Sequence, residues 1–316
     1  MMTHRLREWI VCASVFSIFC VIGQAQEARC KVDGNSSSFL GISTVRLWPG
    51  NAPDAKGQAC EDVPTLTVFE PQPGYGNGSA VLVVPGGAYS GLASNLEGRQ
   101  VADWFTARGF VAFILRYRLP SNGYLLPVPL LDARRAVQVV RAQASQYRVD
   151  PNRIGMIGFS AGGHLAALTA VRPIEGDPNA KDLAGRQPSR LNFLVLGYPW
   201  IGAISSSTSH LSYCRLFNVL DKCDALSKAY SPQLFVTKNA PPTFWYHTTD
   251  DPVVPVEQGL RFYEALLEAG VPAEAHLFAH GAHGTGLGIG DQALSQWPNL
   301  LENWLRSLGL THNEKN

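Results

Sequence analysis

The chain is poor in charge, and no part of it is dominated by charge of one sign. It has 26 Lys and Arg against 25 Asp and Glu in 316 residues, which gives a formal net charge of +1. Because the sequence has neither a basic stripe nor an acidic tail, it indicates neither nucleic acid nor an anionic membrane surface as a partner. Internal repeats and low-complexity tracts are also lacking. These absences favour a folded chain whose ligand carries no strong charge.

The first 25 residues have the pattern of a secretory signal peptide. Arg5 and Arg7 form a basic region, and the apolar run from Trp9 to Ile22 follows it. Small residues then stand at the two recognition positions of a cleavage site that ends at Ala25. The apolar run is too short to span a bilayer comfortably. We therefore expect cleavage near Ala25, a secreted or periplasmic mature protein, and no membrane attachment afterwards.

Closely spaced cysteines are lacking as well. No Cys-x-x-Cys spacing occurs, so we expect no structural zinc site, and no metal or other cofactor is indicated. Four cysteines remain after signal cleavage: Cys30, Cys60, Cys214 and Cys223. An even number in an exported chain predicts disulfides. Proximity in sequence favours Cys30–Cys60 and Cys214–Cys223 among the three possible connectivities.

Strand-like and helix-like segments alternate after residue 40, which predicts an α/β fold with a mostly parallel sheet and helices on both faces. Residues 26–316 then form a single domain. Within it, residues 199–240 are too long for an ordinary connection and form either a cap or a long loop. The predicted strands cover residues 65–69, 80–84, 110–115, 154–159, 193–197, 243–247 and 273–278. The predicted helices cover residues 95–108, 130–147, 256–269 and 298–308, and a further helix follows residue 160.

Ser160 lies in the pattern Gly-x-Ser-x-Gly, at residues 158–162. An apolar strand candidate precedes it and a run of small, helix-compatible residues follows it. Strand, sharp turn and helix are the setting of a nucleophile elbow, in which the turn exposes the serine hydroxyl above a sheet. The context predicts that Ser160 is a nucleophile.

A serine nucleophile needs a base and an acid, which follow it in the order acid, then histidine. Asp250 and Asp251 both come just after the strand at 243–247. Asp251 is favoured because it begins the pattern Asp-x-x-Val-Pro, whereas Asp250 has the alternative of a turn or capping side chain.

Three histidines follow as candidate bases in or after the last strand. His283 is favoured over His280 because it sits in a glycine-flanked turn, and His276 is interpreted as structural because it alternates within the strand. No carboxylate or cysteine spacing supports a metal site built from the three. His164, four residues after Ser160, is interpreted as a packed, hydrogen-bonded residue.

The strand at 80–84 ends in a glycine turn, which is where loops that form an oxyanion hole occur. Gly86 and Gly87 are the candidate amide donors from this turn, and Ala161 supplies the other. The alternative is a plain tight turn. Tyr89 either lines the acyl pocket or packs beneath the loop, and the sequence does not separate these two roles.

These motifs together resemble the α/β-hydrolase serine esterases. More narrowly they resemble secreted carbohydrate esterases, the acetylxylan and feruloyl esterase-like group. The stretches that carry the resemblance are 47–50, 84–89, 158–164, 231–232, 241–244, 250–251 and 283–284. The resemblance implies roles for Ser160, Asp251 and His283 as nucleophile, acid and base. One departure is Ala88, where relatives often have a third glycine.

The resemblance implies a serine carboxylesterase that acts on short-acyl esters of plant polysaccharide or oligosaccharide. A peptidase or lipase of the same fold, and an inactive hydrolase-like binding module, are the alternatives. The chain has no room for the large propeller that prolyl-oligopeptidase-type peptidases carry, and no long apolar cap of the lipase kind is evident. The complete set of mechanistic parts weighs against an inactive module.

Overall fold

The computed structural model describes residues 43–202 and 228–311, and these residues form an eight-stranded sheet in the order β1-β2-β4-β3-β5-β6-β7-β8. β1 and β2 pair antiparallel, as do β2 and β4, and all other neighbours are parallel. The strands are β1 Ser43–Arg46, β2 Thr65–Phe69, β3 Ala80–Val84, β4 Val111–Arg116, β5 Ile154–Phe159, β6 Phe193–Gly197, β7 Thr243–Thr248 and β8 Ala273–Phe278. The predicted mostly parallel sheet is confirmed.

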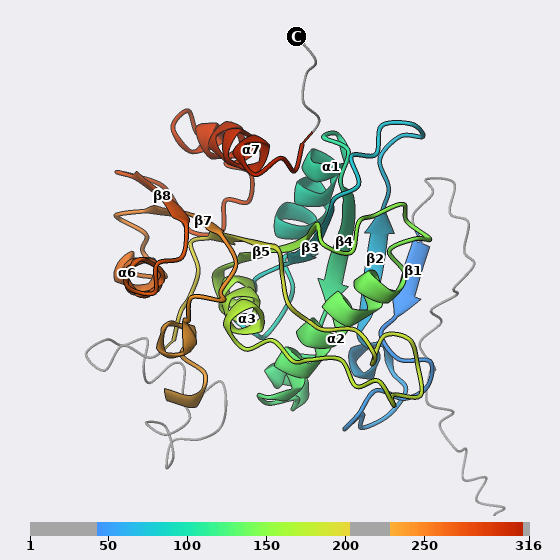
Figure 1. Cartoon of the computed structure of the whole chain (residues 1–316). Coiled ribbons are helices and arrows are strands. Elements are labelled where there is room, and N and C mark those ends of the chain that lie inside the picture. The colour runs from blue at the N-terminus through green and yellow to red at the C-terminus, as the bar shows by residue number, and fades with distance from the viewer. Residues whose placement is uncertain (1–42, 203–227, 312–316) are drawn as a thin grey trace, which may run out of the picture.

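Helices cover both faces of the sheet (Figure 1). α1 (Gln100–Thr106) and α7 (Trp297–Ser307) lie on one face, and their apolar sides pack there with Phe110 and Phe193 in one core. The other face carries a larger core, with the apolar sides of three helices: α2 (Val128–Ala142), α3 (Ser160–Val171) and α6 (Glu257–Glu268). Central strands are therefore buried on both sides, which explains their continuous apolar sequences.

The parallel strands bring distant segments to one edge of the sheet. β3, β5, β7 and β8 all run in the same direction, so the loops that follow them leave from the same edge. Val84, at the end of β3, pairs with Gly158, near the end of β5. Ligand sites of open α/β sheets form at this carboxyl edge. All candidate catalytic residues lie on these loops.

Three elements differ from the sequence-based prediction. The predicted helix at 130–147 is shorter in the structure, where α2 ends at Ala142 and turns follow. β1 was not predicted, because it has four residues, lies at the edge of the sheet and is only partly buried. The predicted helix at 95–108 begins instead with a wider π-helical turn, η2 (Ser94–Arg99), which continues into α1. π-helical turns are frequent at functional sites.

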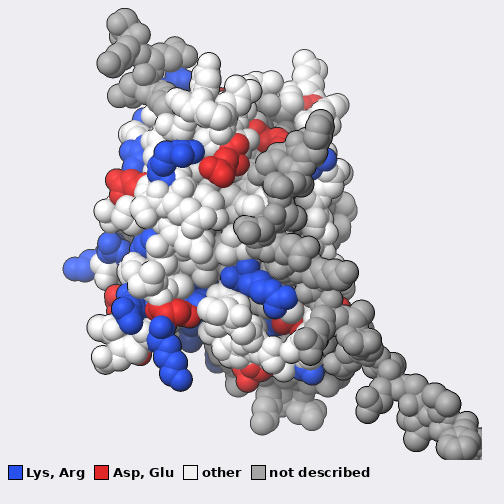
Figure 2. Space-filling view, turned by 90° about the vertical axis from the view of Figure 1, so that its right-hand side faces the viewer, with Lys and Arg blue, Asp and Glu red and all other residues white. Residues whose placement is uncertain are grey.

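Several predictions fall on residues outside the described ranges. These are the signal peptide, Cys30, Cys214, Cys223 and most of the segment 199–240. The division into domains, the cap or loop, and the disulfide pairing stay predictions. Among the described helices, none combines the length and the apolar character needed to cross a membrane. The face in Figure 2 has Lys and Arg interspersed with Asp and Glu on a largely uncharged surface.

Candidate active site

Ser160 occupies a sharp turn between β5 and α3, as the elbow motif predicts. Its φ is +50°, a left-handed conformation that is strained for a residue with a side chain. A Cβ at Gly158 would lie 2.4 Å from the carbonyl oxygen of Gly162, and one at Gly162 would lie 2.2 Å from that of Val84. Both positions therefore need glycine, because the turn packs directly against its own backbone and against β3.

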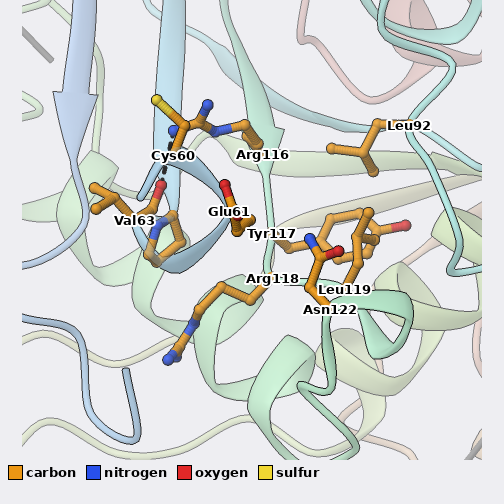
Figure 3. Close-up of a pocket in the computed structure, with 10 residues that line it drawn as sticks. Cys60, Glu61, Val63, Leu92, Arg116, Tyr117, Arg118, Leu119 and Asn122 are labelled. Atoms are coloured by element: carbon orange, nitrogen blue, oxygen red, sulfur yellow. Dashed lines mark hydrogen bonds between the residues drawn. The ribbon is translucent and has the colours of Figure 1, made fainter. Parts of the chain in front are cut away.

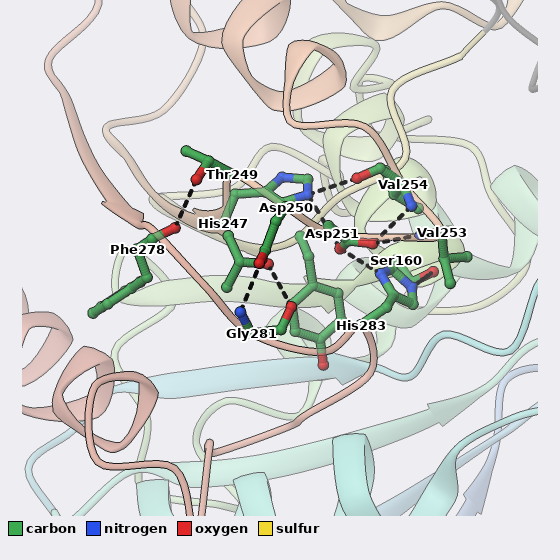
Figure 4. A network of polar contacts seen from close by, with 12 residues as sticks. Ser160, His247, Thr249, Asp250, Asp251, Val253, Val254, Phe278, Gly281 and His283 are labelled. Atoms are coloured by element: carbon green, nitrogen blue, oxygen red, sulfur yellow. Dashed lines mark hydrogen bonds and ion pairs between the residues drawn. The ribbon is translucent and has the colours of Figure 1, made fainter.

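The structure brings Ser160, His283 and Asp251 together (Figure 4). His283 Nε2 lies 2.8 Å from Ser160 Oγ, and His283 Nδ1 lies 2.7 Å from Asp251 Oδ2. A carboxylate only accepts hydrogen bonds, so Nδ1 carries the proton and Nε2 is left to accept from the serine hydroxyl. This is the tautomer in which the imidazole acts as a base toward serine.

Asp251 is held as an anion by an array of donors. Its Oδ1 accepts the amides of Val253 and Val254, each at 2.8 Å, and its Oδ2 lies 3.3 Å from His247 Nε2 as well as beside His283. Burial raises the pKa of Asp251, but hydrogen bonds from His247, His283 and the two amides lower it below its usual value of 3.8. The carboxylate therefore stays charged and fixed in orientation.

The other polar candidates have hydrogen-bond partners other than the serine. Asp250 pairs with His280 at 2.8 Å and accepts the Gly281 amide at 2.9 Å. His276 lies in β8 and pairs with Glu274 two residues earlier. His164 is fully buried, between the Tyr89 hydroxyl and the carbonyl oxygen of Tyr230, at 2.7 Å each. Burial lowers the pKa of His164 to about 4, in agreement with its prediction as a packed residue.

Tyr89 is wholly buried, and its hydroxyl contacts His164. Its backbone has φ +57°, in the left-handed region, and its ring packs edge to face against Tyr117 and His164. The structure thus favours the packing role over the predicted substrate contact, because no part of the ring is exposed.

The glycine loop, residues 85–91, lies against the nucleophile: a Cβ at Gly86 would lie 2.9 Å from Ser160 Cβ. The prediction that the Gly86 amide is an oxyanion-hole donor needs correction. This amide already donates to Glu97 Oε2 at 2.7 Å, so it has no proton left for a substrate oxygen. Gly87 and Ala88 are exposed, and within the described residues their amides and that of Ala161 donate to no other group. The amides of Gly87 and Ala161 therefore remain candidate oxyanion-hole donors, and the Ala88 amide is a further candidate.

Glu97 and Tyr198 are residues that the sequence analysis missed. Glu97 is 3% exposed, and the Tyr198 hydroxyl donates to its Oε1 at 2.8 Å. Burial raises the pKa of Glu97, and the hydrogen bonds from Tyr198 and Gly86 and the electrostatic interaction with His283 offset this effect only partly. His247, behind Asp251, was missed as well. No motif marks these residues, since each acts on a partner far away in the sequence or on a backbone group.

A cavity of about 240 Å³ lies beside the glycine loop (Figure 3). Leu92 lines it together with Glu61 and the segment 116–119 that follows β4. Tyr117 also donates from its hydroxyl to the carbonyl oxygen of Pro85 at 3.0 Å, so one wall of the cavity supports the glycine loop. Over residues 43–202 and 228–311, no group of three or more His, Cys, Asp or Glu side chains is arranged to hold a metal ion.

Residues 66–266 match the family model described as BD-FAE. The chain belongs to the BD-FAE family of α/β-hydrolases. The match spans the glycine loop, the elbow and Asp251, and it ends before His283. The α/β-hydrolase fold and the family resemblance stated from the motifs are thereby confirmed.

Two relatives are similar to this member of the BD-FAE family over most of its length. An acetylxylan esterase of Xylanibacter ruminicola is 33% identical over 237 residues, which are 73% of this chain and 46% of the relative. The endo-1,4-beta-xylanase B of Butyrivibrio fibrisolvens is 33% identical over 69% of this chain and 34% of the relative. The chain therefore spans less than half the length of these two curated relatives.

Solved structures give a fuller overlap. An acetyl ester-xyloside bifunctional hydrolase from Caldicellulosiruptor lactoaceticus has a TM-score of 0.78 at 36% identity, over 85% of this chain and 97% of that one. Thermogutta terrifontis esterase 2, phosphoramylated by tabun, has a TM-score of 0.70 at 26% identity, over 87% and 97%. Both names describe enzymes that hydrolyse esters, and both structures share the fold described above.

Proposed function

We propose that the protein is a serine carboxylesterase with Ser160 as nucleophile, His283 as base and Asp251 as the acid that orients it. One observation carries the proposal, namely the continuous contact from Ser160 Oγ through the imidazole of His283 to the Asp251 carboxylate. A hydroxyl is a weak nucleophile at neutral pH, so its proton must leave as it attacks. The Nε2 atom is in position to take that proton.

The reaction follows from the arrangement in two halves. Ser160 Oγ adds to the ester carbonyl while His283 takes its proton, and the carbonyl π electrons move onto the oxygen. The tetrahedral intermediate collapses, His283 protonates the departing alcohol, and an acyl-enzyme forms. Water then attacks the acyl group while His283 takes its proton. The second tetrahedral intermediate collapses, His283 returns the proton to Ser160 Oγ, and the acid leaves. Asp251 stabilises the imidazolium at each stage without taking its proton.

The oxyanion that forms in each half needs donors that are already aligned. We assign this role to the amides of Gly87, Ala88 and Ala161, which border the nucleophile from the glycine loop and from the start of α3. An aligned donor of this kind contributes roughly 3–4 kcal/mol to lowering the barrier. The positive φ of Gly87, +133°, and of Ala88, +53°, support this role because they turn the backbone away from the regular strand.

We further propose that the substrate is a short-acyl, acetyl-type ester on plant polysaccharide or oligosaccharide, and that the mature protein is secreted or periplasmic. The similarity to an acetylxylan esterase and to an acetyl ester-xyloside hydrolase supports an acetyl group on a sugar as the substrate. The nearly balanced charge of the chain agrees with an uncharged substrate. The N-terminal pattern supports export.

The direct test is hydrolysis of p-nitrophenyl acetate by the wild type and by Ser160→Ala. The variant should lose about 10⁶-fold in kcat, which in practice removes detectable turnover. A fluorophosphonate probe should label the wild type and not the variant. Ser295→Ala is the matched control, because the hydroxyl of this half-buried serine donates to the carbonyl oxygen of Gln292 and, among the described residues, contacts no member of the proposed triad.

Retained turnover or labelling in Ser160→Ala would contradict the assignment of the nucleophile. A panel of acetylated xylan, feruloylated sugars, peptides and acyl esters of graded length tests the substrate class. Preference for acetylated xylan supports the proposal, whereas preference for long acyl chains or for peptides contradicts it in favour of a lipase or a peptidase.

A further inference from the structure

Glu97 places a buried carboxylate between two loops of the active site. One is the glycine loop, and the other is the histidine loop, residues 279–286, which carries His283. The two carboxylate oxygens of Glu97 have different partners: Oε2 accepts from the Gly86 amide and Oε1 accepts from the Tyr198 hydroxyl. Only 3% of the residue is exposed, so water does not compete for either contact. A buried carboxylate is costly unless its partners are in place.

On the glycine loop, the contact fixes the residue directly before the proposed oxyanion donors. A Cβ at Gly86 would lie 2.8 Å from Glu97 Oε2 and 2.9 Å from Ser160 Cβ, so Gly86 is held between the carboxylate and the nucleophile. The peptide that follows leads to the Gly87 and Ala88 amides. A tilt at Gly86 would therefore redirect these donors away from the serine.

On the histidine loop, the contact passes through Tyr198. Its hydroxyl accepts the amide of Gly286 at 2.9 Å while it donates to Glu97. The Gly286 carbonyl oxygen accepts from the Tyr246 hydroxyl at 3.0 Å and from the Trp297 indole at 3.1 Å. The Tyr198 ring also meets the His283 ring edge to face, with centroids 4.9 Å apart. Tyr198 thus contacts the histidine loop at two places, the backbone amide of Gly286 and the imidazole ring of His283.

Only a carboxylate satisfies both donors. The Gly86 amide and the Tyr198 hydroxyl each present a proton, and an ionised carboxylate accepts at both oxygens. Glutamine has one oxygen and one NH₂ group. If its oxygen accepts from Gly86, its NH₂ meets the Tyr198 oxygen, which already accepts from Gly286, and the tyrosine proton loses its acceptor.

We propose that Glu97 and Tyr198 are positioning residues that hold the glycine loop and the histidine loop in one fixed relation, so that the oxyanion amides and His283 act on the same carbonyl group. The inference rests on the proposed esterase function and adds to it two residues outside the triad. Neither residue belongs to the triad or to the proposed oxyanion hole, and Tyr198 meets His283 only by ring packing. Their effect is on the geometry of the triad and the oxyanion hole.

The test uses Glu97→Gln, Tyr198→Phe and the double variant, with kcat and KM measured on p-nitrophenyl acetate. We expect Glu97→Gln to lower kcat by about 10²-fold, since displacement of catalytic groups by about 1 Å has effects of that size. Tyr198→Phe should lower it by about tenfold, because Gly86 keeps its acceptor. KM should change by less than about threefold in both, as for interactions that matter in the transition state.

The double variant tests the connection itself. Since both substitutions break the same path, the double variant should lose no more activity than Glu97→Gln alone. Benzeneboronic acid, which forms a tetrahedral adduct with a serine hydroxyl, should bind each variant more weakly by the factor that kcat/KM falls. If the two residues had a merely structural role, the variants would contain less folded enzyme. The kcat and the boronate affinity per folded molecule, counted by fluorophosphonate titration, would then be unchanged.

Asp62→Asn is the matched control. Asp62 is 8% exposed and, like Glu97, accepts one tyrosine hydroxyl, that of Tyr124, and one backbone amide, that of Ala59. It contacts no residue of the proposed triad or oxyanion hole among the described residues. Its variant should lose stability to a similar degree but keep kcat per titrated site within about twofold.

Unchanged kcat in Glu97→Gln, a loss that lies only in KM, an additive double variant, or an equal loss in Asp62→Asn would each overturn the inference. If Glu97→Gln does not fold, Tyr198→Phe with the boronate titration decides it. An inactive wild type would instead contradict the proposed function. An active wild type with unaffected Glu97 and Tyr198 variants contradicts only this inference.

Discussion

Two aspartate–histidine pairs lie side by side after β7 and β8. They use adjacent aspartates and histidines three residues apart, and their contacts are nearly equal in length, 2.7 Å for Asp251–His283 and 2.8 Å for Asp250–His280. The side chains of the first pair are 0% and 13% exposed, and those of the second are 50% and 87% exposed. The same two residue types thus form one buried pair and one solvated pair.

The difference in exposure goes with a difference in the number of hydrogen-bond donors around each carboxylate. Asp251 has the two valine amides and His247 in addition to its imidazole partner. Among the described residues, Asp250 has the Gly281 amide alone besides His280. Water competes for the exposed pair, so its contact contributes little. The buried pair holds a fixed geometry, and only its imidazole reaches Ser160. Four predictions test this contrast.

The largest effect is expected for Asp251→Asn. The asparagine NH₂ group cannot accept the proton on His283 Nδ1, so it favours the opposite tautomer, in which Nε2 carries the proton and cannot act as base. We expect kcat on p-nitrophenyl acetate to fall by about 10⁴-fold. Circular dichroism should show an unchanged fold. A loss smaller than that of Asp250→Asn would reverse the assignment of the two carboxylates.

The second prediction concerns the pH dependence of stability. The pKa of Asp251 is below 3.8 in the folded protein, so its ionised form stabilises the fold above that pH, and the contribution is lost as pH falls toward the folded pKa. We expect the wild type to exceed Asp251→Asn in free energy of unfolding by on the order of 2 kcal/mol near neutral pH. This difference should shrink below about pH 4 in urea titrations. A difference that stays constant with pH would contradict the linkage.

The third prediction tests the extra partner of the buried pair. His247 Nε2 lies 3.0 Å from the Val254 carbonyl oxygen and 3.3 Å from Asp251, and removal of its proton donor in His247→Phe leaves both acceptors short of a partner. We expect kcat to fall by about tenfold, in line with the loss of an outer hydrogen bond to a catalytic group. His276→Phe is the control, because His276 also pairs with a carboxylate from a strand but lies away from Ser160. Equal kcat values in the two variants would remove His247 from the site.

Local patterns predicted the elements on which the site is built. The strand before Ser160 and the elbow glycines are encoded in a few consecutive residues, so their geometry was predictable. The Asp-x-x-Val-Pro pattern selected Asp251, and the structure gives a physical reason, because the amides of Val253 and Val254 both bind its carboxylate. The pattern names Val254 but not Val253, so these contacts support the choice of Asp251, whose role as the acid stays a prediction.

Contacts between distant segments were not predictable. The role of the Gly86 amide was misassigned because its acceptor, Glu97, lies 11 residues later on a turn whose π-helical form the periodicity does not reveal. Tyr198 meets Glu97 across 101 residues. Such pairs depend on the order of strands in the sheet. β3, which precedes Glu97, and β6, which precedes Tyr198, are separated only by β5. The fold must be known before these contacts can be inferred.

The smallest effect is expected for Asp250→Asn, which removes the charge from the solvated pair. Hydrogen bonds from His280 and from the Gly281 amide lower the pKa of Asp250, yet the side chain lies in water, where exposed pairs of this kind contribute little to stability. We expect kcat within about twofold of wild type, and any stability change to vanish as salt screens the pair. Thermal unfolding at low and high salt, beside kinetics, measures both. A tenfold or greater loss of kcat would mean that the exposed pair sets the position of the histidine loop, and that burial alone does not separate the two carboxylates.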